Sequence, residues 1–458
     1  MEYPGSYFTR PWRIILLIFF IGFFLTLTPI ILLYSVGYSY DWQNGLLKKT
    51  GGLSIDILPA DTSVSLDGVK LNEKMPIRLK NITSRKYDLS LSSPNYYSWQ
   101  KEIEVKDKET IYIKEISLLK QNSPEKISSD LPEILSLSPN GNYLAYAIKK
   151  TDTDNDNKNT YLIFILENST GNNQLIELPT IGNLPQMQWS GDEKYLAIAP
   201  DSTTNDNIFI ISTADKKLTW QIITSDKSAV TKFAWQDSPG QQIFFSTKKE
   251  IFIANPTNAR VTSVSKNDFL DWQTENNQIW TIQLSSTTDK YVITKDTFGF
   301  ATEFATFNVD KEIDKQIILP EILAAHAGQI LLQIRPGDVL IVNQNEQYPI
   351  KADHWRLAPY NDWWLFWTSY EINTYTSGQP PYLLTRSGEG LRDVWPLDHY
   401  NTLGLVWNKR VEALFPYYSV SHNLLDYPVE NSTADSFHKI LYFSGTLKDE
   451  RGLWKLPY

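Results

Sequence analysis

Two stretches of sequence that repeat one another decide the fold. Residues 134–146 read ILSLSPNGNYLAY and residues 187–198 read MQWSGDEKYLAI. In each, an apolar-alternating segment leads into a turn rich in Ser, Asn, Asp and Gly, and a second apolar segment follows. Alternation with a period of two is typical of half-buried β-strands, so each copy predicts two strands joined by a tight turn. The two copies align residue for residue from Leu135 and Met187 onward.

Five weaker copies of this unit follow along the chain, at residues 233–245, 269–282, 322–334, 355–367 and 394–407. The seven turns recur about every 43 residues, which is the repeat length of a four-stranded propeller blade. A single blade cannot bury both of its faces, so blades stack against one another in a closed ring. The sequence therefore predicts an all-β fold with a seven-bladed β-propeller over residues 134–458.

The last blade needs strands beyond the seventh repeat. Residues 439–444 and 452–456 are expected to complete it, and a strand near Ile127 would close the ring. Residues 121–133 are polar and hold two prolines, so they are read as a linker or as this first propeller strand.

The two clearest repeats resemble those of TolB-like and WD-like propellers. Ser138-Pro139-Asn140-Gly141 and Trp189-Ser190-Gly191-Asp192 stand where those repeats place the turn between their two inner strands. The resemblance covers residues 134–198 closely and the later copies by pattern. Because the strands of a propeller converge on one pit, we expect the functional site at the mouth of the central channel or in the loops above it.

A long apolar segment precedes the β-rich part. Residues 14–36 carry no charge and are long enough, at about 1.5 Å per residue, to cross a hydrocarbon core of about 30 Å. Arg10 and Arg13 precede the segment, and aromatic residues flank it on both sides. This pattern predicts a signal anchor in contact with membrane lipid, with residues 1–13 as a cytoplasmic tail and the bulk of the chain outside the membrane. A cleaved signal peptide is the alternative, although the segment exceeds the usual apolar length of about 7–15 residues.

Residues 51–120 alternate between apolar and polar positions and predict a separate β-module, with Asp67-Gly68 as a hairpin turn. The module resembles the PEGA domain family, a small surface β-sandwich. The resemblance rests on residues 52–55 leading into Pro59, then on 64–68, Met75-Pro76, 87–89 and 95–99. Members of that family are typically non-catalytic modules of envelope-exposed proteins, which implies the same placement for this chain.

Composition excludes several classes of function. The chain has 43 Lys plus Arg against 52 Asp plus Glu, a net charge of −9, and no basic stripe, which argues against nucleic acid as a partner. It has no cysteine, which excludes thiol catalysis, disulfides and zinc sites built from cysteine. The five histidines are scattered without zinc-binding spacing, and neither a Gly-x-Ser-x-Gly motif nor a phosphate-binding loop is present.

Two candidate sites remain, each with a structural alternative. Asp152, Asp154 and Asp156 place oxygen ligands at alternate positions as a calcium loop does, but Asn157 and Ile163 stand where such a loop needs Gly and Glu, so a solvated hairpin loop is the alternative. No other cofactor is expected. A cluster of tryptophans could form an exposed platform for sugars or partner side chains, the alternative being packing between blades. Its members are Trp355, Trp363, Trp364, Trp367 and Trp395.

The sequence thus predicts a single-pass envelope protein that is not an enzyme and binds a protein or glycan partner through its propeller. An envelope hydrolase, or the propeller lid of one, is the first alternative, and it requires a nucleophile and a base from distant blades. A structural surface-layer or spacer component is the second.

Overall fold

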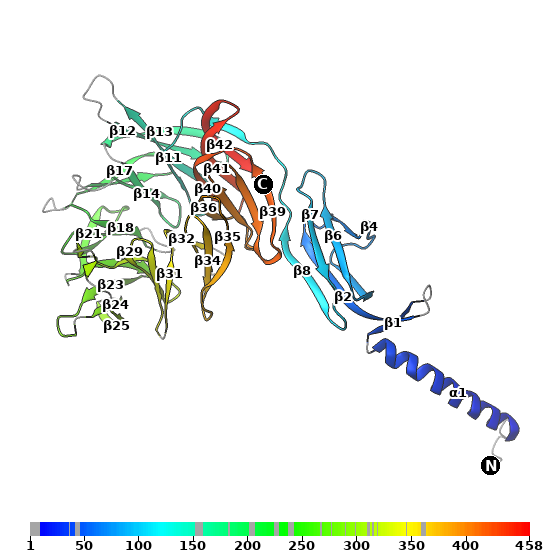
Figure 1. The fold of residues 1–458 in the computed structure, drawn as a ribbon. Helices are drawn as coiled ribbons and strands as arrows, with labels where there is room; N and C mark the ends of the chain where they lie inside the picture. The colour runs from blue at the N-terminus through cyan, green and yellow to red at the C-terminus, as the bar shows by residue number, and fades with distance from the viewer. Residues whose placement is uncertain are drawn as a thin grey trace, which may run out of the picture. The chain divides into compact units, whose positions relative to one another are not determined.

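The computed structural model describes most of the chain, and its residues form two compact units divided between Gln121 and Asn122 (Figure 1). The described residues are 10–35, 37–41, 46–151, 159–181, 184–200, 207–223, 229–236, 242–265, 268–275, 277–288, 290–297, 299–308, 312–313, 316–317, 319–344, 346–358 and 363–458.

The first unit begins with the helix expected from the apolar segment. Helix α1 (Arg10–Ser35) contains Pro29, and its apolar side chains are almost all exposed. An exposed surface of this composition is unfavourable in water and favourable in lipid. By length and composition, α1 can cross a membrane.

The rest of the first unit is a pair of four-stranded sheets, as expected for a small β-sandwich. One sheet is β1 (Tyr38–Asp41), β2 (Leu46–Leu58), β5 (Ile77–Thr83) and β8 (Thr110–Ser117). The other is β3 (Ser63–Leu66), β4 (Val69–Lys70), β6 (Lys86–Ser92) and β7 (Trp99–Glu104). Alternate residues of their strands, such as Leu53, Ile55, Leu89 and Leu91, are buried. Asp67 and Gly68 both have positive φ and form the predicted turn between β3 and β4.

The second unit is built from four-stranded antiparallel sheets, and within the described residues there are eight of them. Seven are formed by consecutive strands and contain the seven repeats. They are β10 (Ile134–Leu137), β11 (Tyr143–Thr151), β12 (Asn159–Glu167), β13 (Asn172–Ile181); β14 (Pro185–Trp189), β15 (Tyr195–Pro200), β16 (Asn207–Ser212), β17 (Lys217–Ile223); β18 (Lys232–Trp235), β19 (Ile243–Ser246), β20 (Ile251–Asn255), β21 (Arg260–Ser265); β22 (Asp271–Glu275), β23 (Gln278–Leu284), β24 (Tyr291–Thr297), β25 (Phe300–Phe307); β28 (Glu321–His326), β29 (Gln329–Arg335), β30 (Asp338–Val342), β31 (Gln347–Lys351); β32 (His354–Ala358), β33 (Trp363–Trp367), β34 (Glu371–Thr376), β35 (Tyr382–Arg386); and β36 (Leu391–Pro396), β37 (Leu403–Trp407), β38 (Val411–Phe415), β39 (Val420–Leu425).

The eighth sheet combines the two ends of the unit. It consists of β40 (Val429–Asp435), β41 (Ile440–Leu447), β42 (Glu450–Pro457) and β9 (Glu125–Ser128). The strand expected near Ile127 is β9, which pairs antiparallel with β42 so that Lys126 faces Trp454. The predicted count of seven blades is not confirmed, because the seventh repeat already has four strands by Leu425 and the later strands form a sheet of their own. Two minor elements are the hairpin β26 (Glu312–Ile313) with β27 (Gln316–Ile317) and the 3-10 turn η1 (Pro416–Tyr418).

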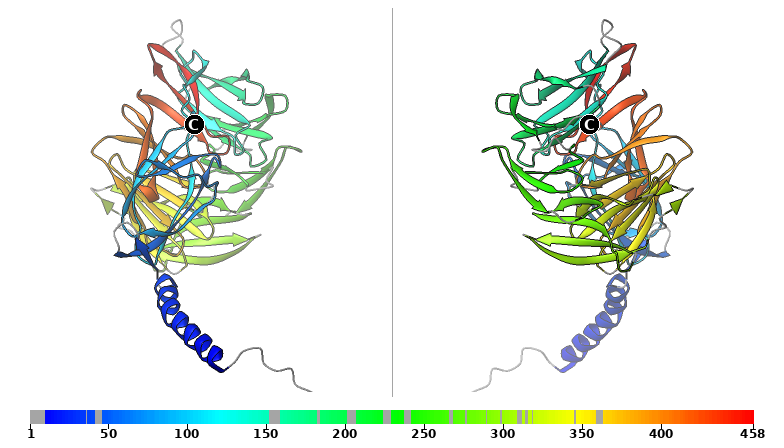
Figure 2. Two further views of the ribbon diagram at one scale, coloured as in Figure 1. Left: turned by 90° about the vertical axis from the view of Figure 1, so that its right-hand side faces the viewer. Right: turned by 90° about the vertical axis from the view of Figure 1, so that its left-hand side faces the viewer.

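The core of the second unit lies between neighbouring sheets. Apolar clusters join each of the first six sheets to the next one, and another cluster joins β41 and β42 to β11. The first strands also contact one another around most of the ring, including β40 with β10. Figure 2 shows the sheets following one another in chain order, from green through yellow and orange to red. This closed arrangement of radial sheets is a β-propeller.

Candidate functional site: the central cavity of the propeller

A cavity of about 1200 Å³ lies where the first strands of the propeller converge. Its wall includes residues of β10, β14, β18, β22 and β28, the first strands of five successive sheets. The polar side chains of these strands that line the cavity therefore face one space, although the residues are far apart in sequence.

Amide side chains form much of the polar wall. Gln186 and Gln188 come from β14, where they alternate with Met187 and Trp189, and Gln273 comes from β22. Gln188 donates from Nε2 to the carbonyl oxygen of Phe233, at 3.3 Å, whereas the side chain of Gln186 is exposed. An amide both donates and accepts hydrogen bonds, so this wall suits a polar ligand without net charge.

An ion pair joins three sheets in the same wall. Lys232 Nζ lies 3.1 and 3.0 Å from the two carboxylate oxygens of Asp271 and also donates to the carbonyl oxygen of Ile322, at 2.9 Å. The backbone N–H of Ile322 donates to the Asp271 carboxylate at 2.7 Å. The two charges neutralise each other, so this part of the wall is polar without being charged.

Tryptophans at the ends of first strands hold neighbouring blades in register. Trp189 donates from Nε1 to the carbonyl oxygen of Ser136, and Trp235 does the same to Gln188, at 3.0 and 2.9 Å. Their rings stack on Tyr143 and Tyr195 of the preceding blade. These indoles are buried, so the role that they show is structural.

The predicted tryptophan platform is wrong for three of its five members. Trp363, Trp364 and Trp367 lie on β33 and are only 4%, 1% and 3% exposed. A second strand of a propeller blade is covered by the neighbouring blades on both faces, which explains why these rings pack between sheets. These three rings pack between blades, which is the alternative that the sequence analysis states for the cluster.

The other two members of the predicted platform, Trp355 and Trp395, are partly buried, and the guanidinium of Arg356 lies over the ring of Trp395. Arg356 Cζ lies 3.2 Å from the ring centroid of Trp395 and 5.3 Å from that of Trp367. Arg356 also forms an ion pair with Asp393, at 3.0 Å, and donates to the carbonyl oxygen of Val394. The face of Trp395 is therefore occupied by a side chain of the protein itself.

The predicted calcium ligands Asp152, Asp154 and Asp156 lie outside the described residues, so calcium binding there stays a prediction. Within the described ranges, no group of three or more His, Asp or Glu side chains is placed to hold a metal ion.

An Asp–His pair that the sequence did not reveal lies in a second cavity, of about 650 Å³. His438 Nδ1 is 2.7 Å from Asp435 Oδ2. The other carboxylate oxygen accepts the backbone N–H groups of Phe437 and His438, which is the bonding of a tight turn. The spacing Asp-x-x-His is the only sequence signal for this pair. These hydrogen bonds close the turn between β40 and β41, which is the role that the contacts of the pair show.

A buried carboxylate links the turns of the first two blades. Glu193 accepts the backbone N–H of Asn140 and the side-chain amide of Asn142, both at 2.6 Å. Burial raises the pKa of Glu193, but hydrogen bonds from Ser138, Asn142 and Asn140 together lower it more, so the pKa in the folded protein lies below its ordinary value of 4.5.

The lowered pKa of Glu193 makes this contact sensitive to acid. A carboxylate whose folded-state pKa is depressed stabilises the protein above its unfolded pKa, and that contribution is lost as the pH falls through the folded value. We expect Glu193→Gln to lower the free energy of unfolding by roughly 1–3 kcal/mol at pH 7 and by much less below pH 4. Denaturant unfolding between pH 7 and 3 checks this. The exposed Glu450→Gln serves as the control and should show neither effect. An equal loss at both ends of the pH range would contradict the expectation.

The fold defines the class: the described chain is an apolar helix, a small β-module and a β-propeller. Residues 50–118 match the family model of the PEGA domain, so the β-module is a PEGA domain. The sequence has no match among the curated proteins.

Several solved propellers are similar in structure. The propeller of Dos1 matches with a TM-score of 0.48 at 10% identity, over 74% of this chain and 95% of that one. The β-propeller domain of the trilobed protease from Pyrococcus furiosus matches with a TM-score of 0.42 at 12% identity, over 65% and 99%. The propeller domain of Cps50 (Swd1) from Myceliophteria thermophila matches with a TM-score of 0.43 at 11% identity, over 74% and 99%.

Proposed function

We propose that this protein is a membrane-anchored, non-catalytic binding protein of the cell envelope, and that the central cavity of its propeller holds a polar segment of a partner protein. The observation that carries the proposal is the cavity wall, in which amide side chains from separate blades face one space. Besides the Lys232–Asp271 ion pair, the wall holds one further residue of each sign, Lys248 and Glu321, so the charges balance and hydrogen bonds are expected to decide which ligand binds.

The anchor and the orientation rest on the first unit. Helix α1 is long and apolar enough to span a bilayer, and Arg10 and Arg13 precede its apolar part. The excess of basic residues on that side favours a cytoplasmic N-terminus. A PEGA domain directly after the helix supports exposure of the propeller outside the membrane.

Two features favour a peptide over a glycan as the ligand. Glycans are held largely by stacking on exposed aromatic rings. Of the tryptophans expected to provide that surface, three are buried, Trp395 is covered by Arg356, and Trp355 is half-buried against Trp364. The side chain of Gln186 has instead the donor and acceptor groups that pair with a peptide backbone, whereas the amides of Gln188 and Gln273 already donate to carbonyl oxygens of the protein. Gln186 is the exposed member of this set and the best position at which to block the cavity.

Gln186→Arg is expected to reduce capture of the partner at least tenfold, because a longer, charged side chain would fill a neutral cavity. The tagged full chain is crosslinked in native membranes, solubilised gently and purified, and the captured proteins are identified by mass spectrometry. Gln379→Arg introduces the same change at an exposed position outside the cavity and should leave capture intact.

The outcomes separate the alternatives. Loss of one envelope protein from the Gln186→Arg sample alone supports the proposal. Glycan-bearing material lost in the same way would favour a glycan ligand. Identical capture by the wild type, Gln186→Arg and Gln379→Arg would contradict binding in the cavity and favour a spacer role.

A further inference from the structure

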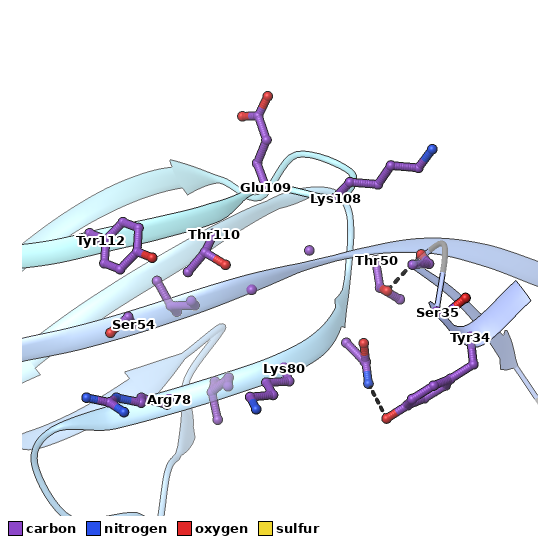
Figure 3. A pocket seen from close by; sticks show the side chains of 16 residues that line it. Tyr34, Ser35, Thr50, Ser54, Arg78, Lys80, Lys108, Glu109, Thr110 and Tyr112 are labelled. Atoms are coloured by element: carbon purple, nitrogen blue, oxygen red, sulfur yellow. Dashed lines mark hydrogen bonds between the residues drawn. The ribbon is translucent and has the colours of Figure 1, made fainter. Parts of the chain in front are cut away.

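A trough of about 850 Å³ runs along the outer face of the PEGA domain (Figure 3). Its floor is the central strand β2, where the outward positions are the small residues Gly52 and Ser54, and its walls are the flanking strands β5 and β8. Ser54 pairs with Arg78 on one side and with Tyr112 on the other. Small side chains on the middle strand between long ones on its neighbours produce the groove.

Gly52 keeps the floor of the trough open. A Cβ at this position would lie 2.7 Å from Thr110 Oγ1, closer than real Cβ atoms approach, so another residue would force the wall to shift.

One end of the trough is fixed to the end of helix α1. Asn81 of β5 donates from its amide to the Tyr34 hydroxyl, at 2.7 Å. Thr50 donates from both its backbone N–H and its side chain to the carbonyl oxygen of Gly37, at 2.8 and 2.9 Å. Since α1 ends at Ser35, a membrane that this helix spans would place the trough beside the lipid headgroups. This step rests on the membrane anchoring proposed above and not on the ligand of the propeller.

The charge of the trough favours an anion. Arg78, Lys80 and Lys108 line it together with a single acidic residue, Glu109. In Figure 3 the side chains of Lys108 and Glu109 both extend away from the trough, so the charge inside it comes from Arg78 and Lys80. Within the part of the chain that the structure describes, Arg78 and Lys80 form no ion pair, whereas Lys49 is paired with Asp107 and the charge of Lys108 also helps to lower the pKa of that carboxyl. Cations without partners at the membrane surface attract anionic lipid.

We infer that this trough binds the phosphate of an anionic phospholipid headgroup. The guanidinium of Arg78 and the ammonium of Lys80 supply the charge-assisted hydrogen bonds that phosphate requires, and the hydroxyls of Ser54, Thr110 and Tyr112 supply neutral ones. Tyr112 combines a polar hydroxyl with an apolar ring, which is also well suited to the headgroup level of a bilayer.

The experiment uses the full chain in neutral maltoside micelles. Dihexanoyl phosphatidylglycerol is titrated in by calorimetry, and dihexanoyl phosphatidylcholine, glycerol 1-phosphate and inorganic phosphate are titrated in parallel. We expect phosphatidylglycerol to bind most tightly, and the double variant Arg78→Ser/Lys80→Ser to weaken its binding about tenfold or more. The control Lys70→Ser/Lys74→Ser removes the same charge from exposed positions outside the trough and should bind as the wild type does.

Three results would overturn the inference. Equal affinity for phosphatidylcholine would show that the phosphate is bound without selection for net charge. Equal affinity for glycerol 1-phosphate or inorganic phosphate would make the ligand a soluble anion and not a lipid. Equal weakening by the control pair would show a general charge effect. The helix stays in a micelle throughout, so failure here leaves the proposed anchoring to be judged separately, by extraction of the protein from membranes.

Discussion

Replacing Trp364 with alanine is expected to lower the free energy of unfolding by about 4 kcal/mol, the largest effect of any substitution considered. The indole is fully buried between the fifth and sixth sheets of the propeller, where it packs with Trp355 and Phe366. Its Nε1 donates to Gln329 Oε1 at 2.8 Å, so the change would leave a cavity and a buried amide that has lost this donor. Denaturant unfolding of the full chain in micelles, followed by far-ultraviolet circular dichroism, measures the loss.

Two further variants show whether the loss of stability comes from the buried ring of Trp364. Trp364→Phe keeps most of the apolar volume but removes the hydrogen bond, so it should cost less than Trp364→Ala. Phe437→Ala removes a ring that is 72% exposed and should change stability by no more than about 0.5 kcal/mol. A Trp364→Ala protein as stable as the wild type would contradict its assignment to the core.

Arg356→Ala is expected to cost about 3 kcal/mol, the second largest effect. The guanidinium lies between the rings of Trp367 and Trp395 and is paired with Asp393 of the next blade. Removing it would leave a carboxylate that is largely buried without its cation, although partial exposure to solvent reduces the cost below that of a fully buried pair. Arg356→Lys should recover only part of the loss, because an ammonium cannot stack and donate in a plane as a guanidinium does.

The matched control for this prediction is Arg386→Ala. Arg386 also pairs with a carboxylate, that of Glu371, but its side chain is exposed, so the change should cost at most about 1 kcal/mol. Equal losses from Arg356→Ala and Arg386→Ala would show that the stacking between the tryptophans contributes nothing.

Much of the fold can be predicted from the sequence because the first two strands of most blades are covered by neighbouring blades. These strands are therefore apolar, and the turns between them contain typical turn residues, as in Ser138-Pro139-Asn140-Gly141. The blade count could not be predicted because β40, the first strand of the eighth sheet, reads VENSTAD and shows almost no apolar alternation. Its position becomes clear only when β39 has completed the seventh sheet.

The candidate site was harder to predict because it depends on contacts between blades. The sequence places a site at the central pit, and the alternation in Gln186-Met187-Gln188-Trp189 is the local signal that one face of β14 is polar. Nothing local indicates that Gln273 faces the same cavity. The sequence predicts a platform from the tryptophans of β33 because it shows how many rings are present but not which neighbours cover them.

The pairing of β9 with β42 determines when the propeller can fold. Lys126 and Glu450 form an ion pair across 324 residues of sequence, so the sheet that closes the ring combines strands made at very different times. While the chain emerges, β9 has no partner, and the intermediate blades expose one face at the open end of the ring. Contacts between residues so distant in sequence form slowly, since the entropy of closing the intervening loop must be overcome first. Folding of the propeller therefore completes only after β42 has been synthesised, and the rate of closure depends on how quickly these two strands meet.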